Sequence, residues 1–489
     1  MKKIISLVLV AAAMLGLGAC AGGTTGQTGQ TETPTDTTAA ENVFMAGYAQ
    51  EIITPDFPVG LMGYGNDKTR ISTGKLNELY VSVLAVRDPE GNTAVMISAD
   101  LMFNKETYTD ALAEWVEEEV GIPAANVIFS SIHQHSTPDL KGDYNKFAEP
   151  LIQKAIKDAV ADLAPAEMYI NSVETKALNF VRHYWNAKGE MVTDHSGDMS
   201  VGLVSHESEA DNEMQLLKFK RGEDKKDIMV INFQTHPLMS TSSSKTQISA
   251  DWVGVLRKNV VKELDCNVMY FSGAGGNLNS TSRIKEENKS TDFKDHGKRA
   301  ANYVIKAEDS YVKVETGPVK VKQVTIDYEV DHSQDHLAEK AKPIYEAYAE
   351  GDMSKAKECL AKTSEFHSVY HAYYLYLRYQ QDTTRSMTIS AISMGDVAFT
   401  AHPYEMFDTN GMELKDGTVG NENYEADKQM ENPYKMTIVT TIANGYNSYI
   451  PSKMGYTNGG YSTDVAHFVP GTGEQVVTDF LNILNELHG

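Results

Sequence analysis

The sequence predicts an α/β fold in which a mixed sheet is flanked by helices and carries a helical insertion around residues 335–380. Short apolar runs rich in valine and isoleucine indicate the strands, and longer segments with apolar residues at helical spacing indicate the helices. The order strand, helix, strand occurs twice, as in proteins whose parallel strands are joined by a helix. Two helical segments then precede a strand near the end of the chain. These two segments are expected to form the insertion beside the core sheet.

The first strand, helix, strand unit follows an earlier strand at residues 81–86. Its two strands are expected at 94–98 and 127–132, which are apolar runs. The helix between them has a candidate cap at Asn104 and a stop at Gly121, with a proline two positions later. This arrangement predicts a pair of neighbouring parallel strands.

A second unit and the helical insertion follow in the same way. The expected elements are strands at 229–233 and 268–271 around a helix at 252–264, a helix near 298–305, helical segments at 335–348 and 354–379, a strand at 387–393 and a last helix at 476–487. Open α/β sheets bind their ligands on the loops that follow the strand ends. We therefore expect the functional side chains directly after these strands.

The charge and the cysteine content exclude several classes of protein. The chain carries a formal net charge of −23, which argues against binding to nucleic acid and against electrostatic docking on anionic lipid. Its apolar fraction of 41% supports an ordinary globular core. Beyond Cys20, only Cys266 and Cys359 are present, too few for a disulfide scaffold and not in a Cys-x-x-Cys metal motif. These two either pair or stay buried as thiols.

The N-terminus has the pattern of a bacterial lipoprotein signal. Lysines and a short apolar run lead to Leu17-Gly18-Ala19-Cys20, so residues 1–19 are expected to be removed and Cys20 to carry lipid. The alternative is an ordinary secretory signal with an incidental cysteine. Residues 20–41 contain no large apolar side chain and are expected to form a flexible linker to a domain over residues 42–489. This predicts an extracytoplasmic protein, lipid-anchored to the bacterial cell membrane or envelope.

Histidines follow two of the predicted strands. His133 and His135 form a His-x-His turn at the end of the strand near residue 132, and an extended backbone would point both imidazoles to the same side. His236 follows a later buried strand in the same manner. Imidazole is a frequent zinc ligand, although a single His-x-His pair is about as often a hydrogen-bonded structural feature. The repetition of the pattern favours a metal site at the strand ends.

Three further segments combine unusual residues near strand ends. Residues 272–279 form a glycine-rich turn that suits close approach of the backbone to a ligand or an oxyanion. Glu405 follows a strand near residue 397 and is expected at the start of a helix, where a carboxylate also stabilises the helix dipole. Residues 443–461 are rich in tyrosine, which in loops usually serves packing. From the residues alone, both a functional and a structural role stay open for each segment.

These segments resemble the neutral/alkaline, non-lysosomal ceramidase family when taken together with Gly47-Tyr48-Ala49, Ile53-Thr54-Pro55 and Gly60-Leu61-Met62-Gly63-Tyr64. The matches occur in the family's order and cover most of the chain from Ala46 to Tyr461. The resemblance implies zinc ligands at His133, His236, Glu405 and Tyr449, and it makes a structural Ca²⁺ or Mg²⁺ possible. It implies substrate-facing groups at His135, Arg182 and Tyr461.

The implied activity is zinc-dependent hydrolysis of the N-acyl bond of ceramide, which releases a sphingoid base and a fatty acid. Zinc lowers the pKa of its bound water from about 15.7 towards 7 and polarises the amide carbonyl. In this mechanism His135 transfers a proton to the leaving amine, and Arg182 and Tyr461 stabilise the oxyanion. The implied partner is a lipid or another amide substrate.

The chain departs from the family pattern at three places. Asn279 occupies the position of a family serine that has been considered catalytic, and asparagine cannot act as that nucleophile. If the serine is essential, this protein is altered or inactive; if water on zinc attacks, Asn279 can still donate a hydrogen bond, and the complete metal set favours the second interpretation. Thr137-Pro138-Asp139-Leu140 replaces Gly-Pro-Gly-Gly, which is expected to reshape the pocket mouth and add a charge. Longer members also carry a C-terminal β-sandwich domain, which we expect this chain to lack.

Alternatives to the ceramidase interpretation stay open at this point. A related zinc amidase or esterase could act on a cell-wall or peptide-like substrate, and a surface-anchored binding protein could keep the fold without turnover. A rival metal site at His367 and His371, which lie at helical spacing, lacks the glutamate of His-Glu-x-x-His and is better explained by a packed aromatic helix. His332 and His336 are discounted in the same way.

Overall fold

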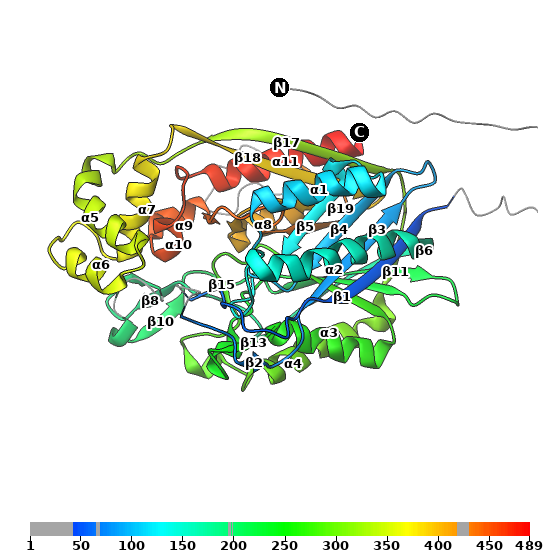
Figure 1. Cartoon of the computed structure of the whole chain (residues 1–489), viewed down its shortest axis with the longest axis horizontal. Helices are drawn as coiled ribbons and strands as arrows, with labels where there is room; N and C mark the ends of the chain where they lie inside the picture. Colours follow the sequence, from blue (N-terminus) through cyan, green and yellow to red (C-terminus); the bar gives the residue numbers. More distant parts are fainter. Residues whose placement is uncertain (1–42, 65–68, 194–196, 198, 418–429) are drawn as a thin grey trace, which may run out of the picture. The chain divides into compact units, whose positions relative to one another are not determined.

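The computed structural model describes residues 43–64, 69–193, 197, 199–417 and 430–489 (Figure 1). The predicted signal peptide (1–19), Cys20 and the predicted linker (20–41) lie outside the described residues and stay predictions. The segment Glu41–Gly489 forms one compact unit. Within the described part of the chain, none of the helices has the length and apolarity needed to cross a membrane.

A nine-stranded mixed sheet forms the centre of the fold, as predicted. Its strands run in the order β14, β12, β11, β6, β1, β3, β4, β5, and β16 pairs with β6. In chain order they are β1 (Met45–Ile52), β3 (Tyr80–Arg87), β4 (Thr93–Ala99), β5 (Val127–Ser131), β6 (Ala164–Glu174), β11 (Glu213–Arg221), β12 (Ile228–Phe233), β14 (Asn267–Ser272) and β16 (Val312–Val314). The pairs β4 with β5 and β12 with β14 are parallel, and the other pairs of this sheet are antiparallel.

The two parallel pairs are the strand, helix, strand units predicted from the sequence. Helix α1 (Glu106–Val120) connects β4 to β5, and α3 (Asp251–Leu264) connects β12 to β14. The predicted stop at Gly121 is confirmed, because this glycine adopts the left-handed conformation with φ of 78°. The predicted cap at Asn104 is wrong by one residue: the helix begins after Lys105, and the Asn104 amide donates instead to Ser131 Oγ over 2.7 Å.

The sheet bends until its two edge strands, β5 and β14, lie beside each other. Ser98 Oγ donates a hydrogen bond to the Tyr270 carbonyl over 2.5 Å, and Ser272 Oγ donates to the Ile132 carbonyl over 3.4 Å. The carboxyl ends of β5 and β12 therefore reach the same region, although five strands separate them in the sheet order.

A second, four-stranded sheet packs on the first; the strands predicted at 387–393 and near residue 397 belong to it, and the other two were not predicted. It consists of β17 (Val319–Glu329), β18 (Thr384–Met394), β19 (Val397–Ala401) and β21 (Met436–Thr440). Phe271 of the first sheet and Phe399 of the second, with ring centroids 5.7 Å apart, belong to the apolar layer between them. In β17, lysines and other polar residues alternate with apolar ones, so no continuous apolar run marks this strand in the sequence.

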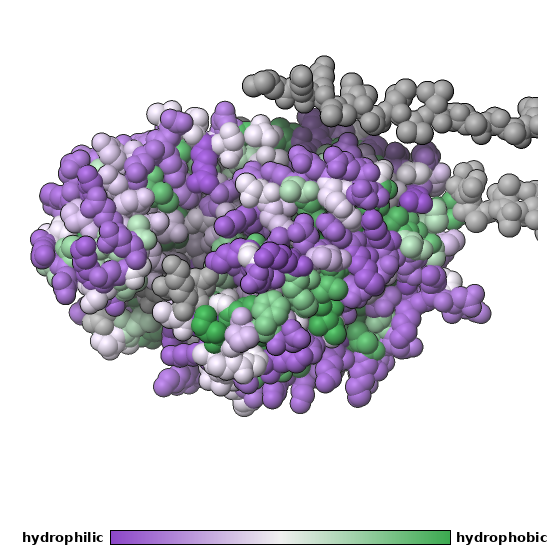
Figure 2. All heavy atoms as spheres, viewed as in Figure 1, coloured by the Kyte–Doolittle hydropathy of each residue, from purple (hydrophilic) through white to green (hydrophobic). Residues whose placement is uncertain are grey.

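Helices cover the outer faces of both sheets (Figure 1). On the first sheet, α1 and α2 (Gly142–Ala161) pack at one end, and α3 and α4 (Phe293–Lys306) pack at the other. On the second sheet, α8 (Asp408–Asp416) and α11 (Thr472–His488) form the cover. The face drawn in Figure 2 carries mainly hydrophilic side chains, with apolar residues gathered below its centre.

The predicted helical insertion is present between β17 and β18. It consists of α5 (Ala338–Ala349), α6 (Met353–Leu360) and α7 (Val369–Tyr379), which share a small apolar core of their own. The segment predicted as one helix over 354–379 is two helices, because the chain leaves the helical conformation after residue 360 and restarts at Ser368. The Ser368 side chain caps α7 by accepting a hydrogen bond from the His371 backbone amide over 2.9 Å.

Short elements surround the strand ends. The described residues form four small sheets besides the two large ones: β2 (Gly74–Lys75) with β13 (Gln247–Ile248), β7 (Phe180–Val181) with β15 (Leu278–Asn279), β20 (Glu405–Met406) with β22 (Tyr449–Ile450), and β8 (Tyr184–Asn186) with β9 (Met191–Val192) and β10 (Leu203–His206). Two short helices, α9 (Lys453–Asn458) and α10 (Tyr461–Asp464), precede α11. These elements carry most of the residues discussed below.

A buried histidine in α4 is expected to make stability depend on pH. His296 is fully buried beside Trp252, with ring centroids 5.4 Å apart. Burial, with a smaller contribution from Arg299, lowers the pKa of His296 to about 3. The unfolded chain binds a proton here below about pH 6.5, whereas the folded chain excludes it. This histidine should therefore lower the free energy of unfolding by roughly 1.4 kcal/mol per unit as pH falls from 6.5 towards 3.

The variant His296→Gln tests this dependence, because glutamine is polar but does not titrate. Between pH 7.5 and pH 5, the wild type is expected to lose roughly 2 kcal/mol more of its free energy of unfolding than the variant. Urea unfolding of both proteins at the two pH values measures the difference. Equal losses of the free energy of unfolding in both proteins would show that His296 does not cause this pH dependence.

Candidate metal centre

The His-x-His turn begins two residues after the end of β5. The prediction of an extended backbone is wrong, because His133 adopts the left-handed conformation with φ of +64°. Backbone hydrogen bonds from Ile132 to Ala99 and from Gln134 to Leu101 hold the turn against the end of β4. The imidazoles of His133 and His135 nevertheless face one site, with ring centroids 4.8 Å apart. The structure thus reaches the predicted arrangement by a different backbone path.

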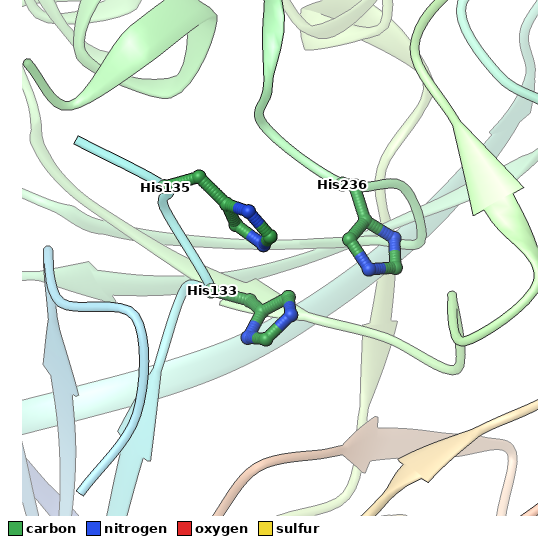
Figure 3. Close-up of side chains that lie close together, drawn as sticks. All are labelled: His133, His135 and His236. Carbon is green, nitrogen blue, oxygen red and sulfur yellow. The ribbon is translucent and has the colours of Figure 1, made fainter. Parts of the chain in front are cut away.

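His236 reaches the same place from β12. Its ring centroid lies 4.9 Å from that of His133 and 5.9 Å from that of His135. Figure 3 shows the three rings pointing towards one another, two from one turn and the third from the facing segment. Their potential ligand atoms all lie within 4.8 Å of one another. The bend of the sheet therefore brings histidines from two separate strand ends into one cluster.

Backbone carbonyl groups fix the protonation of all three rings. The Nδ1 atom of His133 lies 2.9 Å from the Met102 oxygen, that of His135 lies 2.8 Å from the Gly63 oxygen, and that of His236 lies 2.8 Å from the Leu278 oxygen. A carbonyl oxygen only accepts, so each Nδ1 carries the hydrogen and each Nε2 presents its lone pair. Burial lowers the pKa of His135 well below its usual value and that of His236 to about 4, which keeps both rings neutral.

Glu405 supplies a carboxylate to this cluster. Its Oε2 atom lies 3.3 Å from His133 Nε2 and 2.9 Å from His236 Nε2, and the side chain is buried. Burial alone would raise the pKa of Glu405, but the two histidines hold it well below its usual range. The predicted position at a helix start is wrong: Glu405 lies in β20, and α8 begins three residues later. Pairing of β20 with β22, which places Glu405 opposite Tyr449, fixes its backbone instead.

The donor set fits a metal ion. Two imidazole lone pairs directed at the Glu405 carboxylate oxygen would repel it unless a cation lies between them. His135 Nε2 is also buried and has no hydrogen-bond partner among the described residues. Imidazole nitrogen and carboxylate oxygen together are typical ligands of zinc. His133, His236 and Glu405 are thus brought together as the sequence analysis proposed, with His135 adjacent.

Arg182 and two tyrosines lie beside this cluster. Arg182 Nη2 donates to the Gly276 carbonyl over 2.7 Å and to Ser462 Oγ over 3.0 Å. Its guanidinium carbon lies 5.4 Å from the ring centroid of Tyr449 and 5.8 Å from that of Tyr461. Burial and the Glu405 carboxylate raise the pKa of Tyr449, while Arg182 acts in the opposite direction. The residues that the resemblance implies as zinc ligands and substrate-facing groups therefore gather at one place: His133, His135, Arg182, His236, Glu405, Tyr449 and Tyr461.

Asn279 connects the segment that carries Arg182 to the segment that carries His236. It lies in β15, pairs with Phe180 two residues before Arg182, and forms a backbone bridge with His236. Asp139, which was expected to add a charge to the pocket mouth, is buried, and its Oδ2 lies 3.3 Å from Lys141 Nζ. Its charge is therefore paired.

The glycine-rich turn permits a close approach between two backbone segments, and its predicted approach to a ligand or an oxyanion stays a prediction. A small cavity is lined by His133, His236 and Glu405 on one side and by glycines of this turn on the other. A Cβ atom on Gly276 would lie 2.6 Å from the Glu405 carbonyl oxygen, so only glycine fits there. This contact sets the position of β20, and with it the position of the Glu405 carboxylate.

Tyr446 is a member of the site that the sequence analysis did not single out. Its hydroxyl donates to Glu405 Oε1 over 2.8 Å, and its ring stacks on Phe103 with centroids 4.7 Å apart. Burial and the nearby Glu405 charge raise the pKa of Tyr446 well above its usual value, so the hydroxyl keeps its proton. The tyrosine-rich segment was the available signal, but its composition does not say which ring reaches the carboxylate.

Comparisons with known proteins identify relatives of the chain. Residues 44–273 match the family model described as neutral/alkaline non-lysosomal ceramidase, N-terminal. The structure is similar to that of neutral ceramidase from Pseudomonas aeruginosa, with a TM-score of 0.65 and 16% identity over 91% of this chain and 74% of that chain. It is also similar to a ceramidase complexed with C2, with a TM-score of 0.60 and 15% identity over 91% of this chain and 75% of that chain. Comparison with curated protein sequences gave no match.

The two kinds of similarity support different conclusions. At 16% and 15% identity, the solved structures show a shared fold. The family model matches the sequence itself, over a region that contains His133, His135 and His236. Through this match, residues 44–273 belong to the N-terminal domain of the neutral/alkaline non-lysosomal ceramidase family.

Proposed function

We propose that this protein is a zinc-dependent amide hydrolase that cleaves the N-acyl bond of ceramide-type lipids into a sphingoid base and a fatty acid. One observation carries the proposal: the Nε2 atoms of His133 and His236 converge on the Glu405 carboxylate, directly beside His135. Membership of the ceramidase family supports the choice of an amide bond in a lipid.

His133, His236 and Glu405 would hold the zinc ion, with Tyr449 as the fourth protein ligand. When bound, zinc supplies Lewis acidity, which makes water a better nucleophile and polarises a carbonyl group. Tyr446 orients the carboxylate by its hydrogen bond to Glu405 Oε1. The Met102 and Leu278 carbonyl groups do the same for the two imidazoles.

His135 is the residue that moves protons in this proposal. Its Nδ1 is fixed by the Gly63 carbonyl, while its Nε2 is free of protein partners among the described residues and faces the cluster. Such an atom can take a proton from the attacking water and deliver it to the leaving amine nitrogen. Arg182 and Tyr461, stacked beside the cluster, stabilise the negative charge that develops on the carbonyl oxygen.

Gly63 is expected to be required for the position of His135. It has φ of +111°, and a Cβ atom there would lie 2.4 Å from His135 Cβ. Gly63→Ala should therefore displace the imidazole and lower kcat by roughly 100-fold, as a small misplacement of a reacting group does. Steady-state kinetics measure the loss.

Gly91→Ala is the matched control for Gly63→Ala. Gly91 also has a positive φ, of +92°, but a Cβ atom would meet nothing within 4 Å. Both variants carry a similar backbone strain, and only the first disturbs His135. A similar loss of kcat in the two variants would show that backbone strain, and not the position of His135, is responsible.

The predicted N-terminal lipid at Cys20 completes the proposal. A lipid-anchored enzyme outside the cytoplasm would meet a membrane-borne amide at its own surface. Its support is the sequence pattern around Cys20.

The proposal is tested by measuring bound metal by mass spectrometry and hydrolysis of a short-chain fluorescent ceramide, with and without chelator, on the same purified sample. We expect bound zinc and chelator-sensitive release of fatty acid. Bound zinc without hydrolysis of ceramide would overturn the proposed substrate class. Assays with peptide-like and ester substrates would then test whether the protein is a related amidase or esterase. A protein that binds no zinc would overturn the mechanism and favour a binding role.

A further inference from the structure

A second cluster of metal-ligating side chains lies where the helical insertion meets α10. His367 directly precedes the cap of α7, His371 lies one turn later, and Asp464 ends α10. The His367 and His371 ring centroids are 4.5 Å apart. Each of the three residues has a potential ligand atom within 4.8 Å of those of the other two. The missing glutamate of His-Glu-x-x-His and the surrounding tyrosines had favoured aromatic packing for the two histidines, and Asp464, at least 93 positions further along the chain, gives no signal beside them in the sequence.

The hydrogen bonds of this cluster leave two lone pairs facing each other. His367 Nε2 lies 2.5 Å from Asp464 Oδ2, and His371 Nε2 lies 2.8 Å from Gln334 Oε1. Both oxygens accept, so both Nε2 atoms carry hydrogen. The two Nδ1 atoms, 3.2 Å apart, then present lone pairs to each other. Only a cation between them, either a proton or a metal ion, makes this contact favourable.

The geometry suits a metal ion of the zinc class. Two imidazoles bound to one tetrahedral zinc at about 2.0–2.1 Å place their nitrogens about 3.3 Å apart. The Asp464 carboxylate on the outer nitrogen of His367 resembles the partner that usually orients a metal-bound histidine. The His367 side chain is 46% exposed, which leaves a route from solvent and room for water ligands.

We propose that His367, His371 and Asp464 form a second binding site for a divalent transition metal, distinct from the centre at His133, His236 and Glu405. The two imidazoles supply the ligand nitrogens. The carboxylate fixes the His367 ring and balances the charge. Arg378, the nearby cation, donates to the backbone carbonyls of Asp464 and Ala466 over 2.9 and 2.7 Å, so the carboxylate stays available.

Occupancy of this site would tie the insertion to the helix that carries Tyr461. The Tyr461 ring lies 5.3 Å from that of Tyr370 on α7, and it also faces Arg182 at the first centre. Through the hydrogen bond between Asp464 and His367, an ion bound by the two histidines would therefore restrict the end of α10 and with it Tyr461. This consequence for catalysis rests on the proposed function, whereas binding of the metal does not.

The test uses a His133→Ala/His236→Ala background, in which the first centre has lost two ligands. Titration with Co²⁺ followed by absorption, and with Zn²⁺ followed by mass spectrometry, is expected to give one bound ion per chain. Adding His367→Ala or His371→Ala should weaken binding more than about 100-fold, since even loss of a supporting residue costs about 10–100-fold. Adding Asp464→Asn should weaken it about 10–100-fold.

His332→Ala in the same background is the matched control. His332 also pairs with a carboxylate, Asp335, over 3.0 Å, but it lacks a second facing imidazole in the described structure. This variant should bind metal as the background does. No bound ion in the background, or equal binding after His367→Ala and His371→Ala with unchanged thermal unfolding, would overturn the proposal. Because the background cannot form the first centre, this result is independent of whether the protein hydrolyses ceramide.

Discussion

Replacing His133 by alanine is expected to remove both the bound zinc of the first centre and hydrolysis, with kcat/KM falling more than about 100-fold. The His133 Nε2 atom lies 3.3 Å from Glu405 Oε2, and the left-handed turn at this residue holds the ring there. Loss of a residue that merely supports a ligand already costs about 10–100-fold in metal affinity or activity, so loss of a ligand should cost more. Metal content and steady-state kinetics measure the two effects.

The control for His133→Ala is His332→Ala, which removes an imidazole far from the first centre. His332 hydrogen-bonds to Asp335 and to the Asp382 carbonyl in the region of the helical insertion. It should keep the wild-type zinc content and kcat/KM. A His133→Ala protein that folds, retains its zinc and hydrolyses ceramide at the wild-type rate would rule out the proposed centre.

Replacing Arg182 by lysine is expected to lower kcat by about 100- to 1000-fold while the zinc content stays unchanged. Arg182 Nη2 donates to the Gly276 carbonyl and to Ser462 Oγ, and its guanidinium carbon lies 5.4 Å and 5.8 Å from the ring centroids of Tyr449 and Tyr461. Lysine keeps the charge but cannot reproduce this planar set of donors. Removal of one donor to an oxyanion typically costs this much.

The Arg182→Lys experiment is informative because this variant is expected to lose kcat while its metal content stays unchanged. Arg299→Lys is the matched control, because Arg299 of α4 donates, among the described residues, to Ser290 Oγ and the Lys176 carbonyl and has no contact with the first centre. It should leave both quantities unchanged. If Arg182→Lys keeps its zinc and a wild-type kcat, Arg182 has no role in stabilising the transition state.

The sequence was sufficient for features that depend on local pattern. The strand, helix, strand units around α1 and α3 follow from apolar periodicity, and placing ligands after the strands follows from the topology of parallel pairs. This is why His133 and His236 could be proposed as partners before the sheet was known. The helical insertion was recognised in the same way, although the break before Ser368 was not.

Features that depend on contacts between distant segments could not be read from these patterns. The left-handed turn at His133 depends on backbone hydrogen bonds to the end of β4. The place of Glu405 depends on its pairing with Tyr449, and the role of Tyr446 depends on which tyrosine that pairing leaves nearest the carboxylate. The roles of Arg182, Asn279 and Tyr461 in turnover stay predictions.

The order in which the ligands occur along the chain has a consequence for assembly of the protein. His236 and Glu405 are 169 positions apart, so a chain growing on the ribosome exposes all three histidines long before the carboxylate. The proposed ligand set is complete only when β20 pairs with β22 and brings Glu405 to the histidines. An ion bound there acts as a cross-link that stabilises the folded chain over the unfolded one. In the proposed enzyme, zinc would thus reach its complete ligand set only after the last third of the chain has folded.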